Sequence, residues 1–436
     1  MDGSGGARDA VNPHYFDHVM QTATRHEVEV SEDVYSGSGV KLLAKGARLD
    51  ESTRERLLQH KLSRPLEDYV QIGGAITPEQ LQPVAQALLD EHELLRALCG
   101  AEADAAQALA RLRLTAPLQS LLTVYAEAGA SRLRHAVGVA LMARALARQL
   151  LPGDIESQRS LALAGLLHDV GELYIDPAFL ARDTPLQAEQ WRHIVTHPLV
   201  GQRVLQGMAG AEVAQLVLCH HERLDGFGYP RGLGAEQFEL PAQLLAAAEW
   251  LMGLLENDAG LELAMSIHAS VATRLIPGEF SPAVLDRLRA AGRATAAGPL
   301  ADGDHGLELA LPQVVQVAEL LQRFREIRPR LRERIATSTP ELRAMLALCG
   351  QRIDQLQQAF SSAGLDQMGP AHVVQQLARR DPEVQQEVLA LVREFAWRMR
   401  ELERAALMRA GLISAEDQAL VQGLIDAIRG AARQPD

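Results

Sequence analysis

The segment LVLCHHERLDGFGYP, residues 216–230, does most to decide the fold of this chain. It opens with apolar residues, as a buried helix does, and two adjacent histidines follow, His220 and His221. Because neighbouring side chains on a helix point in different directions, both rings cannot enter one apolar core. At the end of a helix they can spread apart and hold two metal ions, or a metal and a substrate. The segment therefore favours a metal site in a helical protein.

A second segment, LALAGLLHDVGEL at residues 161–173, places His168 and Asp169 at the end of another buried helix. Taken alone, such a histidine is more often a core residue with satisfied hydrogen bonds than a ligand. His135 and His197 also lie beside apolar helical patterns, so the histidines form a series along the helices. Neutral imidazoles with a carboxylate suit iron, manganese, cobalt, nickel or zinc, whereas magnesium and calcium prefer oxygen ligands.

The composition predicts a mainly α-helical protein of several domains. A chain of 436 residues is too long for one hydrophobic core, so several domains are expected. Only 4% of the residues are aromatic, which favours helices over sheets. The predicted parts are a flexible N-terminus at 1–25, a small α/β module at 26–76, a helical metal-binding domain at 77–289, a linker at 290–306 and a bundle-like helical tail at 307–436. Cap patterns predict helix starts at Ser52–Glu55, Thr77–Gln80, Thr184–Gln187 and Ser281–Pro282, and the tail has helix starts near residues 312, 340, 382 and 414.

Charge and targeting signals limit the possible partners and location. The formal net charge of −13 repels polyanions, so no nucleic-acid partner is expected. Three dispersed cysteines form no CxxC pair and suggest reduced core residues. The N-terminus lacks a signal-peptide pattern, and no apolar run is long enough for a membrane span. We therefore expect a cytoplasmic protein.

The motifs HDVGE and HHERLDGFGYP together resemble the HD-GYP family, a branch of the HD-domain metal-dependent phosphohydrolases. The similarity runs from near His135 to about Leu288, and Gly228, Tyr229 and Pro230 are intact. The resemblance implies an all-helical fold and bacterial cyclic di-GMP phosphodiesterase activity. It also implies two or three metal ions, commonly iron or manganese, and signalling partners such as GGDEF-domain proteins.

The resemblance assigns roles to individual residues. The implied metal ligands are His135, His168, Asp169, His197, His220, His221 and Glu249. Asp169 would bridge the metals, and Asp169 and Glu172 are the candidate catalytic residues. The candidate substrate-binding residues are Arg223, Asp225, Gly228, Tyr229 and Pro230, and a carboxylate of Glu222 or Asp225 could orient a ligand imidazole. Ser131 stands where trinuclear members carry a glutamate, so two divalent ions are expected.

Three departures separate this chain from the family pattern. Glu172 replaces a lysine that assists the substrate phosphate, which reverses the local charge. Glu249 replaces an aspartate ligand, and the alternative of a surface glutamate stays open. The segment WLMGLLENDAGLELAM, residues 250–265, lacks the expected Arg-Pro-Tyr-Arg-like motif.

The departures leave three hypotheses. The first is a phosphodiesterase that hydrolyses cyclic di-GMP, or a related cyclic nucleotide, through a hydroxide activated by metal ions in bacterial second-messenger signalling. The second is a catalytically degenerate HD-GYP protein that acts as a cyclic-dinucleotide receptor or an interaction scaffold. The third is a helical signalling adaptor without a metal. Six intact ligand positions favour the first.

Overall fold

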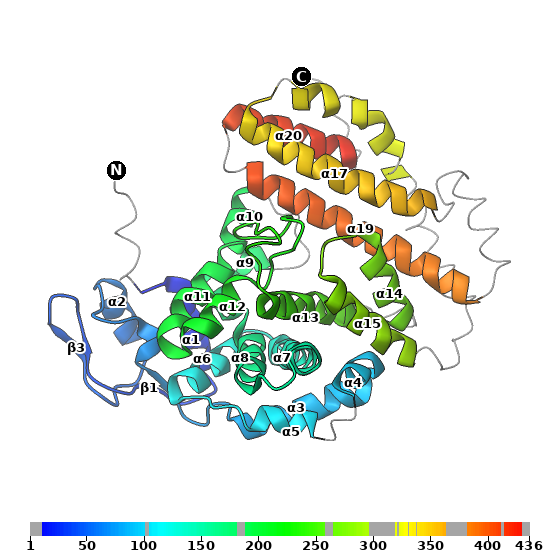
Figure 1. The fold of residues 1–436 in the computed structure, drawn as a ribbon. Helices are drawn as coiled ribbons and strands as arrows, with labels where there is room; N and C mark the ends of the chain where they lie inside the picture. Colours follow the sequence, from blue (N-terminus) through cyan, green and yellow to red (C-terminus); the bar gives the residue numbers. More distant parts are fainter. Residues whose placement is uncertain are drawn as a thin grey trace. The chain divides into compact units, whose positions relative to one another are not determined.

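The fold was obtained as a computed structural model of the full chain (Figure 1). The structure describes residues 11–100, 104–180, 188–257, 265–295, 319–362 except 321, 330 and 337, 382–410 and 414–429. The chain forms two compact units, and neither is a continuous segment. The first unit comprises Met1–Thr184, His193–Glu222 and Phe238–Met252, and the second comprises Pro185–Arg192, Arg223–Gln237 and Gly253–Asp436.

Helices dominate the first unit, which confirms the mainly α prediction. Its helices are α1 (Pro13–Thr22), α2 (Glu51–Leu58), α3 (Pro78–Glu91), α4 (Glu93–Cys99), α5 (Ala105–Ala110), α6 (Ala116–Glu127), α7 (Arg132–Leu150), α8 (Ile155–Leu167), α9 (Pro177–Leu180), α11 (His197–Met208) and α12 (Ala211–Leu218), with the 3-10 turns η1 (Leu66–Asp68) and η2 (Val170–Tyr174). Helix α13 (Leu240–Asn257) begins in this unit. Helix α7 is buried on nearly every side and packs against α8, as expected for a central helix.

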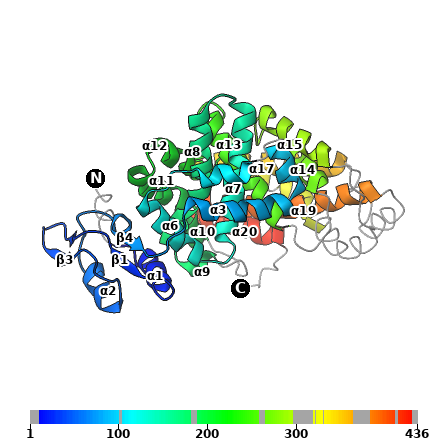
Figure 2. The ribbon, with the colours of Figure 1, turned by 90° about the horizontal axis from the view of Figure 1, so that it is seen from below.

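A small α/β module precedes the central helices, near the N-terminal end of the first unit (Figure 2). Strands β1 (Val28–Val30) and β4 (Val70–Ile72) pair antiparallel, with Val28 opposite Ile72. Strands β2 (Val34–Tyr35) and β3 (Lys41–Leu43) form the second antiparallel pair. The predicted module therefore contains the expected short strands and a short helix, α2.

The second unit is helical among its described residues. Its helices are α14 (Met265–Leu275), α15 (Pro282–Thr295), α17 (Pro340–Ser362), α19 (Pro382–Ala410) and α20 (Ala415–Arg429), with further helical residues between 319 and 336. Helix α10 (Ala188–Ile194) begins in this unit. Apolar side chains of α14, α17, α19 and α20 share one core cluster. Helices α17, α19 and α20 start where the proline and serine signals predicted.

The structure corrects several predicted boundaries. Part of the predicted flexible N-terminus is helix α1, because Asn12 accepts hydrogen bonds from the backbone amides of His14 and Tyr15 at 2.9 and 3.1 Å. The cap of α2 is Asp50 rather than Ser52. Helix α15 extends into the predicted linker as far as Thr295. The rest of that linker, the cap predicted at residues 184–187 and the helix start near 312 lie outside the described residues.

Cap residues and core residues elsewhere agree with the sequence. Helix α3 starts at the Thr77–Gln80 capping box with Pro78 in its first turn. All three cysteines are free and buried.

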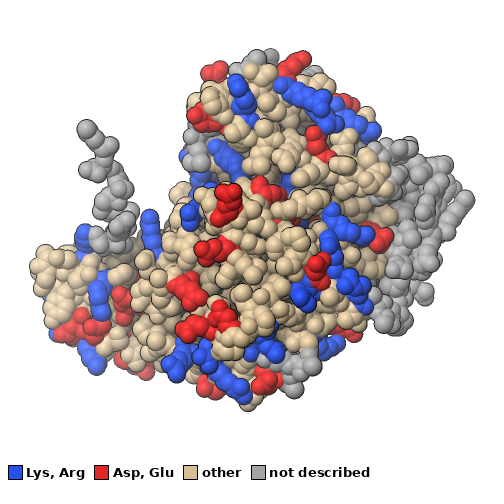
Figure 3. Space-filling view, viewed as in Figure 1, with Lys and Arg blue, Asp and Glu red and all other residues tan. Residues whose placement is uncertain are grey.

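On the face drawn in Figure 3, acidic and basic side chains are interspersed rather than gathered by sign.

Two close backbone contacts fix the helices that carry the histidines. A Cβ atom on Gly165 of α8 would lie 2.7 Å from the Cα atom of Ala140 in α7. A Cβ atom on Gly171 would lie 2.0 Å from the carbonyl oxygen of His197. Only glycine permits these approaches, so both positions hold the His168 segment against its neighbours.

Gly165→Ala should lower the free energy of unfolding by about 1–3 kcal/mol, because the added methyl group meets backbone that cannot rotate away. The matched control is Gly207→Ala in α11, where a Cβ atom meets nothing within 4 Å. That change should stabilise the protein by up to about 1 kcal/mol through helix propensity. Urea unfolding of the full chain measures both, and equal effects would show that α7 and α8 do not touch here.

Candidate metal centre

Local structure places each histidine of the centre at a helix end. Helix α8 ends at Leu167, so His168 and Asp169 follow its last turn. His197 opens α11, while His220 and His221 follow α12. His168 and His220 have no exposed surface, and His197 is 2% exposed.

Backbone carbonyls fix the orientation of three of these rings. In each ring, Nδ1 lies within hydrogen-bond distance of the carbonyl oxygen three residues earlier. The pairs are His168 with Gly165 at 2.8 Å, His197 with Ile194 at 2.8 Å and His220 with Val217 at 2.5 Å. A carbonyl can only accept, so each Nδ1 carries a proton, and each ring in its neutral form turns the lone pair of Nε2 inward. This is the usual preparation of a histidine for metal binding.

The Nε2 atoms of His197 and His220 lie 3.0 Å apart. With both Nδ1 protons committed to carbonyls, two lone pairs face one another unless a proton or a metal ion lies between them. Asp169 Oδ1 is 3.3 Å from His197 Nε2 and 3.4 Å from His220 Nε2. The ring of His221 lies beside both, with its centroid 4.2 Å from that of His220 and 5.0 Å from that of His197. The donor atoms present therefore suit a metal ion.

A second group of donors lies on the other side of Asp169. His168 Nε2 is 3.1 Å from Asp169 Oδ2 and 3.1 Å from Glu249 Oε2. His135 Nε2, on α7, is 2.9 Å from the same Glu249 oxygen. Glu249 is thus a member of the cluster and not a surface glutamate, because its side chain is only 15% exposed.

The donors fall into two groups that share one carboxylate. In the first, ligand atoms of His135, His168 and Asp169 lie within 4.8 Å of one another. In the second, those of Asp169, His197, His220 and His221 do the same. The structure therefore brings together all seven residues predicted as ligands, with Asp169 common to both groups.

The pKa shifts show how strongly the cluster attracts positive charge. Burial alone would lower the pKa of His168, but the carboxylates of Asp169 and Glu249 outweigh it and raise this pKa to about 10. Burial lowers the pKa of His220 to about 4. Burial disfavours the charged forms of Asp169 and Glu249, yet the neighbouring histidines hold the pKa of each well below its usual value. A bound metal would have to displace the proton of His168.

Glu172, predicted as a catalytic residue, pairs with an arginine that the sequence reasoning missed. Arg132 Nη1 lies 2.9 Å from Glu172 Oε2. Arg132 also lies over the ring of Tyr125, 5.0 Å from its centroid. Burial and the charge of Asp169 raise the pKa of Glu172, which Arg132 opposes. The available signal was the position of Arg132 one helical turn before His135.

The predicted substrate-binding residues belong to the second unit, whereas all predicted metal ligands belong to the first. Arg223 is buried, with its side chain 3.6 Å from Glu279. Asp225 accepts a hydrogen bond of 2.6 Å from Arg352 on α17 and caps the amide of Phe227 at 3.1 Å. These contacts use Arg223 and Asp225 to hold the loop itself.

Helix α19 holds the remainder of this loop. Arg409 donates to the carbonyl oxygens of Gly226 and Gly228 at 3.1 and 3.2 Å. Arg404 lies over the ring of Tyr229, which is 5% exposed, at 5.1 Å from its centroid. Pro230 ends the motif and is half-buried. The diagnostic loop is thus fastened to the C-terminal helices.

A buried ion cluster beneath the loop was also missed from the sequence. Glu279 is 2% exposed and accepts hydrogen bonds from Arg352 at 3.2 Å and from Arg398. Burial opposes ionisation, but the three surrounding arginines lower the pKa of Glu279. Arg352 and Arg398 lie on helices 73 and 119 positions away along the chain, so no local pattern could have indicated this cluster.

Comparison with known families identifies the part of the chain that carries the centre. The HD domain family matches residues 117–273, a range that contains every predicted metal ligand. This part of the chain is an HD domain.

Curated relatives of this chain include phosphodiesterases of cyclic dinucleotides. The 3'3'-cGAMP-specific phosphodiesterase 3 of Vibrio cholerae is 25% identical over 54% of this chain and 53% of its own length. The 3'3'-cGAMP-specific phosphodiesterase 1 of the same species is 34% identical, with coverage of 28% of each chain. The cyclic di-GMP phosphodiesterase PA4108 of Pseudomonas aeruginosa is 39% identical over 26% of this chain and 28% of its own. The predicted resemblance is confirmed.

The alignments span about half of the length of the first relative and less than a third of the other two. Among the described residues, no helix combines the length and apolar character needed to cross a membrane.

Adding manganese(II) or iron(II) to the metal-free protein should raise the Tm. At a hundredfold excess of metal over Kd, the folded state should gain about 2.7 kcal/mol of stability. Magnesium should act much more weakly on this nitrogen-rich set. Because His168 holds a proton below a pKa of about 10, the metal competes with that proton. The shift should therefore grow from about pH 6 to about pH 8. His220→Ala should abolish it, and the exposed His60→Ala should not. Equal shifts in both variants would place the ion elsewhere.

Glu279→Gln should cost about 3–5 kcal/mol, because it leaves buried arginines without their shared anion. The control is Glu387→Gln, whose ion pair with Arg274 is about half-exposed. Loss of that pair should cost less than about 1 kcal/mol. Denaturant unfolding compares the two, and a small loss for Glu279→Gln would contradict the role of the cluster.

Proposed function

We propose that the HD domain hydrolyses a phosphodiester bond of a cyclic dinucleotide, cyclic di-GMP or a related 3'3'-cGAMP, with two divalent metal ions. The observation that carries the proposal is the pair of ligand groups that share Asp169. The relatives named above support the substrate class. The partnership with GGDEF-domain proteins stays a prediction of the resemblance.

The residues fit two metal ions of the proposed kind. His135, His168 and Glu249 would hold one ion, while His197, His220 and His221 would hold the other. Imidazole-rich sets with few carboxylates suit iron or manganese, and also nickel, cobalt or zinc. When bound, such ions lower the pKa of a water molecule and polarise phosphoryl oxygens.

The chain's own residues supply the preorganisation. Carbonyl-anchored rings keep Nε2 of His168, His197 and His220 directed inward, so no reorientation is needed on binding. Asp169 holds its negative charge between the two groups, since the histidines keep its pKa low. The fixed Nε2 atoms and the Asp169 carboxylate therefore favour binding of positive charge at one place, without rearrangement of the protein.

Arg132 resolves part of the difficulty that Glu172 raises. An unpaired carboxylate at the position of the family's lysine would repel a substrate phosphate. Arg132 lies 2.9 Å from that carboxylate and offsets its charge. The arginine also brings a cation close to the centre, where the family pattern has its lysine.

The receptor hypothesis keeps one specific argument in its favour. An arginine paired with Glu172 is less available to a phosphate than a free lysine would be. A protein of this kind would bind a cyclic dinucleotide without turning it over.

The direct test incubates full-length protein, loaded with manganese or iron, with cyclic di-GMP and with 3'3'-cGAMP. Chromatography should detect linear dinucleotide or mononucleotide product. Asp169→Asn should abolish turnover because it removes the shared anion, whereas Asp90→Asn, on the exposed side of α3, should leave it unchanged. Saturable binding without product would support the receptor hypothesis, and absence of both would contradict the proposed function.

A further inference from the structure

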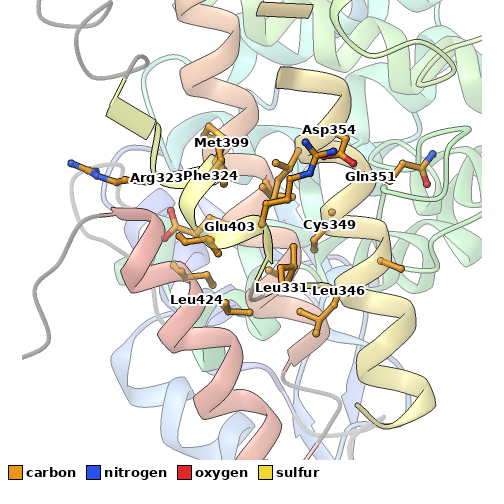
Figure 4. Close-up of a pocket in the computed structure, with 18 of the residues that line it drawn as sticks. Arg323, Phe324, Leu331, Leu346, Cys349, Gln351, Asp354, Met399, Glu403 and Leu424 are labelled. Atoms are coloured by element: carbon orange, nitrogen blue, oxygen red, sulfur yellow. The ribbon is translucent and has the colours of Figure 1, made fainter. Parts of the chain in front are cut away.

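The C-terminal helices enclose a cavity that the proposed phosphodiesterase does not use. Its volume is about 720 Å³, within the range of small-molecule sites. Helical residues between 319 and 336 form one wall, and α17, α19 and α20 form the others. Figure 4 shows Leu331, Cys349 and Leu424, from three different helices, directed toward the same space.

The body of the cavity is apolar. Phe324 is 2% exposed, Leu346 is 3% exposed and Met399 is 7% exposed, and all three line it. Burial raises the pKa of the Cys349 thiol to about 11, so this wall residue is neutral. Close-packed interiors rarely hold a void much larger than a water molecule, so a space of this size is suited to an apolar occupant.

The charged residues around the cavity give it a local positive balance. Four arginines and two carboxylates line it, in a protein with a net charge of −13. Two of the arginines have acidic partners: Arg328 pairs with Asp354 at 2.8 Å, and Arg323 pairs with Glu319 at 3.2 Å. Arg332 and Arg400 are exposed at the rim and form no ion pair with a described residue. An anion placed there would meet a cation whose charge is not already offset.

We propose that this cavity binds a single-chain amphiphile with an anionic head, namely a fatty acid. The hydrocarbon chain would fill the space beside Leu331 and Leu346, where burial of apolar surface drives binding. The carboxylate would lie at Arg332 or Arg400, whose guanidinium groups suit a planar anion. The lining residues all belong to the second unit, and the predicted metal ligands belong to the first. Fatty-acid binding can therefore be tested separately from the proposed phosphodiesterase activity.

The test is calorimetric titration of delipidated full-length protein with dodecanoate, below its micelle concentration. The control ligand is dodecanol, which has the same chain without the charge. Dodecanoate should bind saturably and about tenfold more tightly than dodecanol, the usual contribution of one charge-assisted hydrogen bond. Absence of saturable binding would overturn the proposal.

Variants locate the site. Arg332→Gln combined with Arg400→Gln should weaken dodecanoate binding about tenfold and leave dodecanol unchanged. Arg325→Gln, an exposed position among the helical residues 322–329 that does not line the cavity, should change neither. Leu331→Trp should narrow the cavity and weaken binding of both ligands. Unchanged affinity in the double arginine variant, or after Leu331→Trp, would place the ligand elsewhere and overturn the proposal.

Discussion

Two imidazole nitrogens that face one another constrain the first unit. Nε2 of His197 and Nε2 of His220 lie 3.0 Å apart, while both Nδ1 atoms are committed to backbone carbonyls. Without a proton or a metal ion between the two nitrogens, this arrangement sets lone pair against lone pair in a buried place. Close packing at Gly165 and Gly171 keeps the helix ends from separating, so the fold holds the donors in place. The HD domain is therefore a scaffold that holds these electron-pair donors close together.

The sequence predicted the helices and the ligand set for physical reasons. Caps such as Thr77–Gln80 are local signals, so α3 begins at the predicted place. The candidate ligands were found because helix-terminal histidines repeat in a family pattern. Arg132 and Glu279 were not, since an ion pair depends on which helices pack together, and that information is not local. Asn12–Pro13 was a readable cap that the glycine-rich start obscured.

The second unit combines two features on the same helices. Arg352 of α17 and Arg409 of α19 hold the loop that contains Gly228 and Tyr229. Cys349 and Met399, on those two helices, line the apolar cavity. Buried arginine–glutamate contacts specify one arrangement strictly, because an unpaired charge in the interior is costly. The C-terminal helices are therefore part of the structure around the motif and not an independent appendage.

The central claim is that the donors on both sides of Asp169 capture metal ions. Anomalous diffraction from crystals of the manganese-loaded protein tests this most directly. The account predicts two peaks, one among His135, His168 and Glu249 and one among His197, His220 and His221, with Asp169 between them. A difference map without peaks there, or with the ion bound at other residues, would contradict it.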